Sequence, residues 1–495
     1  MDNSPSSGKA MPYYRLRAAA IDGRATNIYF RRNQLRRLNN ELLAKKTELM
    51  TAIVNDSGNT NAEALAEFYL TLSALNTYFG GLDPQDELQN EYRIANGKDA
   101  VDARQAVGIA YIEPATHSYL YSVVVPIAAA VAAGNCVLVV IEQTLKTLPG
   151  LLQSLLKKAL DPETVEIAPS KVHDKGFLDA YVQVIQTGRP DNISPPILYS
   201  QPDGLAIGVV DRTANMEEAA KALVAARFSF GGTSCYAPDV VLVNEHVKTG
   251  FLNAAIQHSI QYLTKDSGSP SETTRRFEKK DRKSSEESDV VQVITSGSNG
   301  EILFVKDRAI LLKLRKIRRK ALYVHSVTSM DDAINLADSL SAEAPPALAT
   351  YVFGAPASCK YLSQFIASHA TFVNHIPREM LIGPAAPMHI PVSPSVRYPV
   401  NAFTTPRPAF FNKSTVTHEL EGILADGSRQ AILQKQLELM KKLEVPPDRP
   451  VKQMIGFFEQ GILVGLGTVA TPILLALGTA GYLGVTRVLL PKVRG

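Results

Sequence analysis

Three cysteines, Cys136, Cys235 and Cys359, are the first residues to consider as nucleophiles. They are widely spaced and form no Cys-x-x-Cys pair, which argues against a disulfide framework or a zinc site, and we expect no bound metal. A cysteine that stands alone in a globular chain is usually part of the core. The residues around each cysteine must therefore decide whether it does chemistry.

Cys235 lies in the segment FSFGGTSCYAPDVVLV, residues 228–243. This segment resembles the nucleophile segment of the aldehyde dehydrogenases, F-x-N-x-G-Q-x-C-x-A-P, with Cys235 at the position of the catalytic cysteine. Upstream, IEPATHSYLYSVVVPIAAAVAAGNCVLVV is similar to the family segment that runs from P-W-N-Y-P to A-A-G-N-x-V-V-x-K. Further similarities in RRNQLRRL, ATYVFG and FTTPRPAFF extend the resemblance over roughly residues 31–411 and favour the membrane-bound fatty-aldehyde branch.

The resemblance implies that a Cys235 thiolate adds to an aldehyde and that the adduct passes hydride to a nicotinamide. The oxyanion of this adduct needs hydrogen-bond donors, and either Thr116 or His117 falls at the family's Asn position. The family's general base, a Glu, corresponds to Gln201, 34 positions before Cys235. An amide cannot take up a proton near neutral pH, so release of the acid loses roughly 10²–10⁴ in rate.

The cofactor that the resemblance implies is NAD or NADP, but most of the family's contacts are replaced. Val140 stands where the family has the Lys that binds the adenosine ribose, and Gln143 replaces a nearby Glu. Gly188 and Arg189 fall in the phosphate turn, whose following helix is replaced by DNISPPILYS. A helix N-terminus ordinarily receives the pyrophosphate, so its loss weakens the site, although Arg189 could compensate as a point charge. No carboxylate is found at residues 316–321, near the family's nicotinamide-ribose Glu.

Strand-like and helix-like segments alternate along most of the chain, which predicts parallel strands joined by helices. This alternation favours an α/β doubly wound fold, and the resemblance implies the aldehyde dehydrogenase form of it, with two doubly wound domains and an oligomerisation arm, followed here by a C-terminal transmembrane helix. The net charge of +4 is small for 495 residues and comes with no basic-aromatic stripe, so no nucleic acid is expected. The basic stretch 313–320 could touch anionic lipid, but a solvated helix face is favoured. Residues 265–288 read as a solvated loop.

The segment from Gly461 to Val485 has 25 residues without a charged side chain. At roughly 1.5 Å per residue, this length crosses a hydrocarbon core of roughly 30 Å. A single span so close to the C-terminus predicts insertion after synthesis, with the preceding domains in the cytosol. Basic residues flank both ends, so the host organelle stays open, and the endoplasmic reticulum is favoured.

These patterns predict six regions in order. They are a disordered or frayed N-terminus (1–26), a Rossmann-like dinucleotide-binding domain (27–204), a catalytic domain with Cys235 (205–390), an oligomerisation arm (391–412), a C-terminal helix with a Pro-rich hinge (413–450) and a transmembrane helix (461–485).

Two functional hypotheses follow. The first is an oxidoreductase that oxidises a lipophilic, long-chain aldehyde to the acid with NAD(P) through a thiohemiacetal on Cys235. The second is a catalytically impaired pseudoenzyme that serves as a membrane-anchored structural or regulatory partner, because the general base and the cofactor contacts are replaced. Covalent capture of an aldehyde by Cys235 without a nicotinamide is a weaker third possibility. The resemblance also implies a homodimer. Each hypothesis that uses Cys235 requires its sulfur to lie at the bottom of a tunnel between two α/β lobes.

Overall fold

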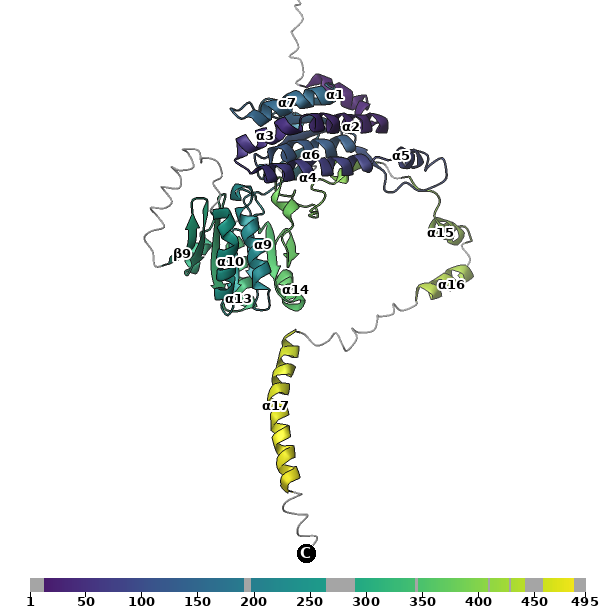
Figure 1. The fold of residues 1–495 in the computed structure, drawn as a ribbon. Coiled ribbons are helices and arrows are strands. Elements are labelled where there is room, and N and C mark those ends of the chain that lie inside the picture. The colour runs from purple at the N-terminus through teal and green to yellow at the C-terminus, as the bar shows by residue number, and fades with distance from the viewer. Residues whose placement is uncertain are drawn as a thin grey trace, which may run out of the picture. The chain divides into compact units, whose positions relative to one another are not determined.

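The computed structural model describes residues 13–190, 197–263, 290–342, 346–407, 410–426, 429–440 and 457–484. The chain divides into two compact units, residues 1–412 and 413–495. The first unit is built on two mostly parallel sheets, each covered by helices. In Figure 1 the helices α1–α4, α6 and α7 lie together in one lobe, and α9, α10, α13 and α14 lie together in the other. The predicted α/β class is confirmed.

The first sheet is parallel throughout, with strand order β4-β3-β2-β5-β6. The chain moves outward from β2 through β3 to β4, and then returns to the other side of β2 with β5 and β6. Strand order therefore reverses beside β2. β2, β3 and β5 are buried along their whole length and consist largely of β-branched and other apolar residues, as expected for central parallel strands. The strands are β2 (Ile109–Glu113), β3 (Cys136–Val140), β4 (Val165–Ala168), β5 (Val182–Ile185) and β6 (Ile197–Tyr199).

Helix α6 (Tyr119–Ala132) is the central helix of this lobe, and every residue from Leu120 to Ala132 is buried. Its sequence is apolar all round, which is typical of a helix enclosed on every side. It packs against α4 and against β2 and β3. The other helices here are α1 (Tyr14–Ile21), α2 (Ile28–Ala44), α3 (Lys46–Ser57), α4 (Asn61–Gly80), α5 (Pro84–Glu91), α7 (Thr147–Ala159) and α8 (Lys175–Leu178).

The expectation of a disordered or frayed N-terminus is wrong for residues 14–26. Helix α1 and a short 3₁₀ turn occupy these residues, and the side chains of Leu16 and Ala19 are buried. These two apolar residues lie three positions apart, so they face the core from the same side of α1. Helices α2 and α3 follow and meet at Lys45. Residues 1–12 lie outside the described part of the chain.

The second sheet has strand order β13-β12-β7-β8-β11-β10-β9, and only the β9–β10 pair is antiparallel. Helices α9 (Met216–Phe228), α10 (Lys248–Leu263), α12 (Arg308–Leu312), α13 (Met330–Ala342) and α14 (Pro356–Phe365) accompany its strands. The strands are β7 (Ala206–Val210), β8 (Val240–Asn244), β9 (Val291–Gly297), β10 (Gly300–Val305), β11 (Ala321–Val327), β12 (Ala349–Phe353) and β13 (Thr371–Val373). The loop expected over 265–288 lies outside the described residues.

The segment expected to be an oligomerisation arm contains β14 (Thr404–Pro406), which pairs in antiparallel fashion with β1 (Arg104–Ala106) of the same chain. Exchange of this arm between two copies therefore stays a prediction.

The second unit contains α15 (Thr415–Asp426), α16 (Arg429–Leu439) and α17 (Phe457–Gly484). Within α17, the 24 residues Glu459–Tyr482 have a mean hydropathy of 2.0 and are long and apolar enough to cross a membrane. A helix at the predicted position is confirmed as a candidate span. The Pro-rich hinge at 445–450 lies outside the described residues.

Glu67 on α4 is an acidic group in the core, where it is 1% exposed. Its Oε1 accepts the backbone N–H of Tyr121 at 3.3 Å, in the first turn of α6. Ser118, the residue before α6, makes no capping hydrogen bond because its backbone is left-handed, with φ 45°. Glu67 therefore takes the place of an N-cap. Burial raises the pKa of Glu67 to about 7.

We predict that Glu67→Gln changes the pH dependence of stability. The pKa of Glu67 is higher in the folded chain than in the unfolded chain, so the free energy of unfolding of the wild type falls as pH rises from about 4.5 to 7 and levels off above that. The variant lacks this decline, so from pH 5 to 8 it should gain about 2.5 kcal/mol relative to the wild type. Chemical denaturation of the full chain in one detergent measures this difference. The exposed Glu91→Gln is the control, and equal pH profiles for Glu67→Gln and the wild type would contradict the assignment.

Candidate active site

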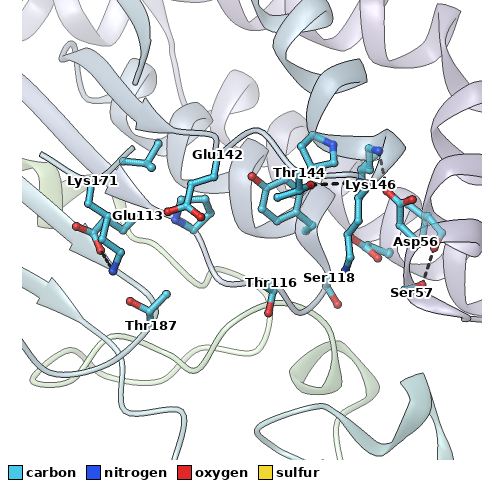
Figure 2. A pocket seen from close by; sticks show the side chains of 17 residues that line it. Asp56, Ser57, Glu113, Thr116, Ser118, Glu142, Thr144, Lys146, Lys171 and Thr187 are labelled. Atoms are coloured by element: carbon cyan, nitrogen blue, oxygen red, sulfur yellow. Dashed lines mark hydrogen bonds and ion pairs between the residues drawn. The ribbon is translucent and has the colours of Figure 1, made fainter. Parts of the chain in front are cut away.

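A cavity of about 300 Å³ lies at the carboxyl ends of the strands of the first sheet. Glu113 ends β2, Val140 ends β3, and Thr187 follows β5 by two residues. Figure 2 shows the side chains of Glu113 and Thr187 at this cavity, together with Asp56 and Ser57 from α3 and Lys146 just before α7. In an open α/β sheet, ligands bind at the carboxyl ends of strands where the strand order reverses. The reversal beside β2 therefore accounts for the position of the cavity.

Four carboxylates and two ammonium groups line the cavity. Glu113 pairs with Lys171 at 2.8 Å and also accepts the phenol O–H of Tyr111 at 2.8 Å. Asp56 accepts the backbone N–H groups of Thr147 and Leu148 at the start of α7, at 3.0 and 2.7 Å. The remaining charged residues are Glu67, Glu142 and Lys146.

Two of the residues expected at the site line this cavity. Val140 is 4% exposed and contributes apolar surface to the wall, and Thr116 lies in the loop after β2. Gln143 and Arg189 are exposed, and neither they nor Gly188 are among the lining residues. Residues 187–190 contain no helix.

The cavity does not fit a dinucleotide as the family's site does. A pyrophosphate is ordinarily received by free N–H groups at a helix N-terminus and by nearby cations. Here Asp56 occupies the first N–H groups of α7, and Glu67 occupies an N–H group of α6. Lys171 is already paired with Glu113. An incoming phosphate would therefore meet carboxylates at both helix ends.

Cys235 follows a tight turn in which one position, Gly232, can be occupied only by glycine. The 3₁₀ turn η2 (Phe230–Gly232) comes directly after α9, and Gly232 has φ 68°. A Cβ atom on Gly232 would lie 2.6 Å from the carbonyl carbon of Arg319, which is too close for any other residue. The turn leaves Cys235 5% exposed, and Cys235 is not among the residues that line the cavity.

Burial raises the pKa of the Cys235 thiol above its ordinary value. The charges of Lys316, Arg397 and Arg318 act in the opposite direction, but burial is the larger cause. At neutral pH the sulfur is therefore held mainly as the thiol, which is the less nucleophilic form.

Lys316 lies beside Cys235 and has 3% of its side chain exposed. Its ammonium donates to the backbone carbonyl of Cys235 and to Asp239 Oδ2, the latter at 2.7 Å. The other carboxylate oxygen, Oδ1, pairs with Arg227 at 3.2 Å. The expectation that the basic stretch 313–320 forms a solvated helix face is wrong, because α12 ends at Leu312. Asp239, which lies 77 positions earlier in the sequence, pairs with Lys316 and allows it to be buried.

His117 joins the loop after β2 to the nucleophile turn. Its Nδ1 lies 3.1 Å from Thr233 Oγ1, and its Nε2 lies 2.9 Å from the carbonyl oxygen of Leu381. Burial lowers the pKa of His117, so the ring is neutral at neutral pH. A carbonyl can only accept, so Nε2 carries the single ring hydrogen. His117 therefore lies near the nucleophile turn, but its one N–H is already used by Leu381.

Gln201 precedes β7 and is partly buried. Its amide oxygen is buried and has no hydrogen-bond partner among the described residues. The position expected to hold the general base therefore holds a neutral amide whose acceptor is unsatisfied.

Sequence analysis did not identify Asp239, Arg227 or Arg397 as part of the site. Arg397 is 2% exposed, and its guanidinium lies over the ring of Tyr236, 5.4 Å from the centroid. It donates to backbone carbonyls, including that of Ile382 at 3.3 Å. The sequence offers no local signal for these contacts, since 162 positions separate Arg397 from Cys235.

Residues 16–176 match the sequence model of the aldehyde dehydrogenase family. Among curated relatives, the chain is 22% identical over 250 residues to 4,4'-diaponeurosporen-aldehyde dehydrogenase of Staphylococcus aureus, covering 46% of this chain and 53% of that protein. It is 24% identical over 261 residues to aldehyde dehydrogenase family 3 member B2 of Mus musculus, covering 50% of this chain and 54% of that protein. The matched stretch thus spans about half the length of these relatives.

Solved structures support the same fold. The substrate-bound state of Staphylococcus aureus AldH has a TM-score of 0.65 at 17% identity, covering 81% of this chain and 93% of that chain. A glyceraldehyde-3-phosphate dehydrogenase from Methanocaldococcus jannaschii, complexed with NADP, has a TM-score of 0.60 at 15% identity, covering 81% and 93%. Residues 16–176 therefore form an aldehyde dehydrogenase family domain, and the chain has the fold of the solved aldehyde dehydrogenase structures.

Proposed function

We propose that this chain is a catalytically impaired aldehyde dehydrogenase homologue that acts as a membrane-anchored structural or regulatory partner. The observation that carries the proposal is Gln201, whose amide oxygen is buried without a partner among the described residues, and which the resemblance aligns with the family's general base. Without a general base, no water molecule is activated to hydrolyse a thioester on Cys235. The rate of acid release falls by roughly 10²–10⁴ as a result.

The surroundings of Cys235 support the same proposal. The thiol is buried and its pKa is raised, so little thiolate is present to attack a carbonyl. The neutral ring of His117 has committed its only N–H to Leu381, so it offers no free donor to an oxyanion. The cavity beside Val140 presents carboxylates to a pyrophosphate.

Oxidation of a lipophilic aldehyde with NAD(P) is the second candidate, and one observation favours it. Lys316, Arg397 and Arg318 place positive charge around Cys235, which stabilises a thiolate or an oxyanion once formed. An aldehyde of this kind partitions into the bilayer, so the candidate span α17 would hold the chain where the substrate is concentrated. Under either candidate, we propose that residues 1–412 face the cytosol.

We predict that the full chain in detergent does not form NAD(P)H when given a long-chain aldehyde with NAD⁺ or NADP⁺. Absorbance of the reduced nicotinamide measures turnover, and Cys235→Ala is the matched control because it removes only the sulfur. The proposal expects the two traces to coincide. Steady turnover that disappears in Cys235→Ala would overturn the impaired assignment and establish the oxidoreductase.

We predict that Gln201→Glu alone does not raise NAD(P)H formation above the Cys235→Ala background, although it restores the missing carboxylate. The reason is that the contacts expected at Val140 and at the phosphate turn are also absent, and one restored group cannot replace them. Gln85→Glu, on the exposed face of α5, controls for the added charge. Rapid oxidation by Gln201→Glu would contradict the claim that the cofactor site is lost.

A further inference from the structure

The helix N-termini at the cavity are already occupied by carboxylates of the same chain. Asp56 accepts two N–H groups at the start of α7, and Glu67 accepts one at the start of α6. A helix N-terminus attracts anions because its first N–H groups are unpaired. Once an internal carboxylate has bound them, this attraction is used up and a second anion is repelled. The carboxylates at the two helix N-termini therefore disfavour binding of an anionic ligand in this cavity.

The charges that remain favour a cation. Four carboxylates line the cavity against two ammonium groups, Lys146 and Lys171, so negative groups are in excess even with Glu67, whose pKa is raised to about 7, only partly ionised at neutral pH. Lys171 is engaged by Glu113 at 2.8 Å. Glu142, in the loop between β3 and α7, is exposed and has no ion-pair or hydrogen-bond partner in the described part of the chain. In Figure 2 it lies on the same side of the cavity as Glu113 and Lys171. Glu142 is thus a carboxylate free to bind a cation.

The remaining wall is largely apolar. Val140, Tyr119, Leu148 and Pro149 present hydrocarbon or aromatic surface to the cavity. Ser118 also lines it, is 7% exposed, and has a hydroxyl that is buried without a hydrogen-bond partner. A buried polar atom left unpaired is uncommon and is explained by a group that the site normally binds. A ligand for this cavity therefore needs an apolar body and a polar head.

We propose that this cavity binds an amphiphilic primary amine, with its ammonium group on Glu142 and its hydrocarbon chain along Val140, Tyr119 and Leu148. The same carboxylates exclude NAD(P). This inference shares with the proposed function the exclusion of NAD(P) from the cavity, but it concerns what the cavity binds and not what Cys235 does. It would hold even if Cys235 were found to react with an aldehyde.

The test uses three ligands of equal chain length, octylamine, octanol and octanoate, together with NAD⁺. Binding to the full chain in lipid nanodiscs is measured by calorimetry, with empty nanodiscs as the blank for partitioning into lipid. We expect octylamine to bind at least tenfold more tightly than octanol, and octanoate and NAD⁺ not to bind. Equal affinity for octylamine and octanol would overturn the proposal, as would NAD⁺ binding that octylamine displaces.

Two variants locate the ammonium group. Glu142→Gln should weaken octylamine about threefold to tenfold and leave octanol unchanged, because it removes one partly exposed ion pair. Glu91→Gln, an exposed carboxylate on α5, should leave both affinities unchanged. Glu142 is in a loop and makes no bond that the fold needs, so its variant should fold normally. Unchanged octylamine affinity in Glu142→Gln would place the amine elsewhere and refute the site.

Discussion

The buried carboxylate of Asp239 is the interaction on which the geometry around Cys235 depends. It is 0% exposed and accepts four hydrogen bonds, from Arg227, Lys316 and the backbone N–H groups of Ala206 and Ile317. These donors come from α9, from the start of β7 and from the segment before β11. A charge so deeply buried is tolerated only when it is fully paired, so loss of one partner should be costly. The nucleophile turn is therefore held by electrostatics as much as by packing.

The order of the helices and strands could be predicted from the sequence because the residue pattern of each element lies within its own segment. The apolar run Val240–Val243 and the helical periodicity of Met216–Phe228 are visible in the sequence. Strand β8 and helix α9 begin and end within one or two residues of these bounds. The apolar run after Gly461 likewise predicts a helix that could span a membrane, whatever the rest of the chain does. Cys235 and Gln201 were identified through the resemblance to the aldehyde dehydrogenases, by alignment with the family's cysteine and by the family's spacing from it to the general base.

The contacts that decide the chemistry could not be predicted, because they join residues distant in sequence. Lys316 looked like part of a solvated basic face, and only the carboxylate of Asp239 explains its burial. His117 and Thr116 were equivalent candidates in sequence. In the structure His117 contacts Thr233, whereas Thr116 lines the cavity. Asp56 reaches the N-terminus of α7 because of how α3 packs, and no short sequence motif predicts that packing.

The chain thus has the fold of the aldehyde dehydrogenases, and we propose that the groups that complete their reaction are replaced. The central claim is that Cys235 is held as a buried thiol without a base. The most direct measurement is the pH profile of its alkylation by iodoacetamide, followed by mass spectrometry of the Cys235 peptide in the full chain. The account predicts slow alkylation at neutral pH and a midpoint above the ordinary thiol pKa of 9.0, because burial outweighs the nearby charges. Rapid alkylation at pH 7 with a midpoint below that value would contradict it.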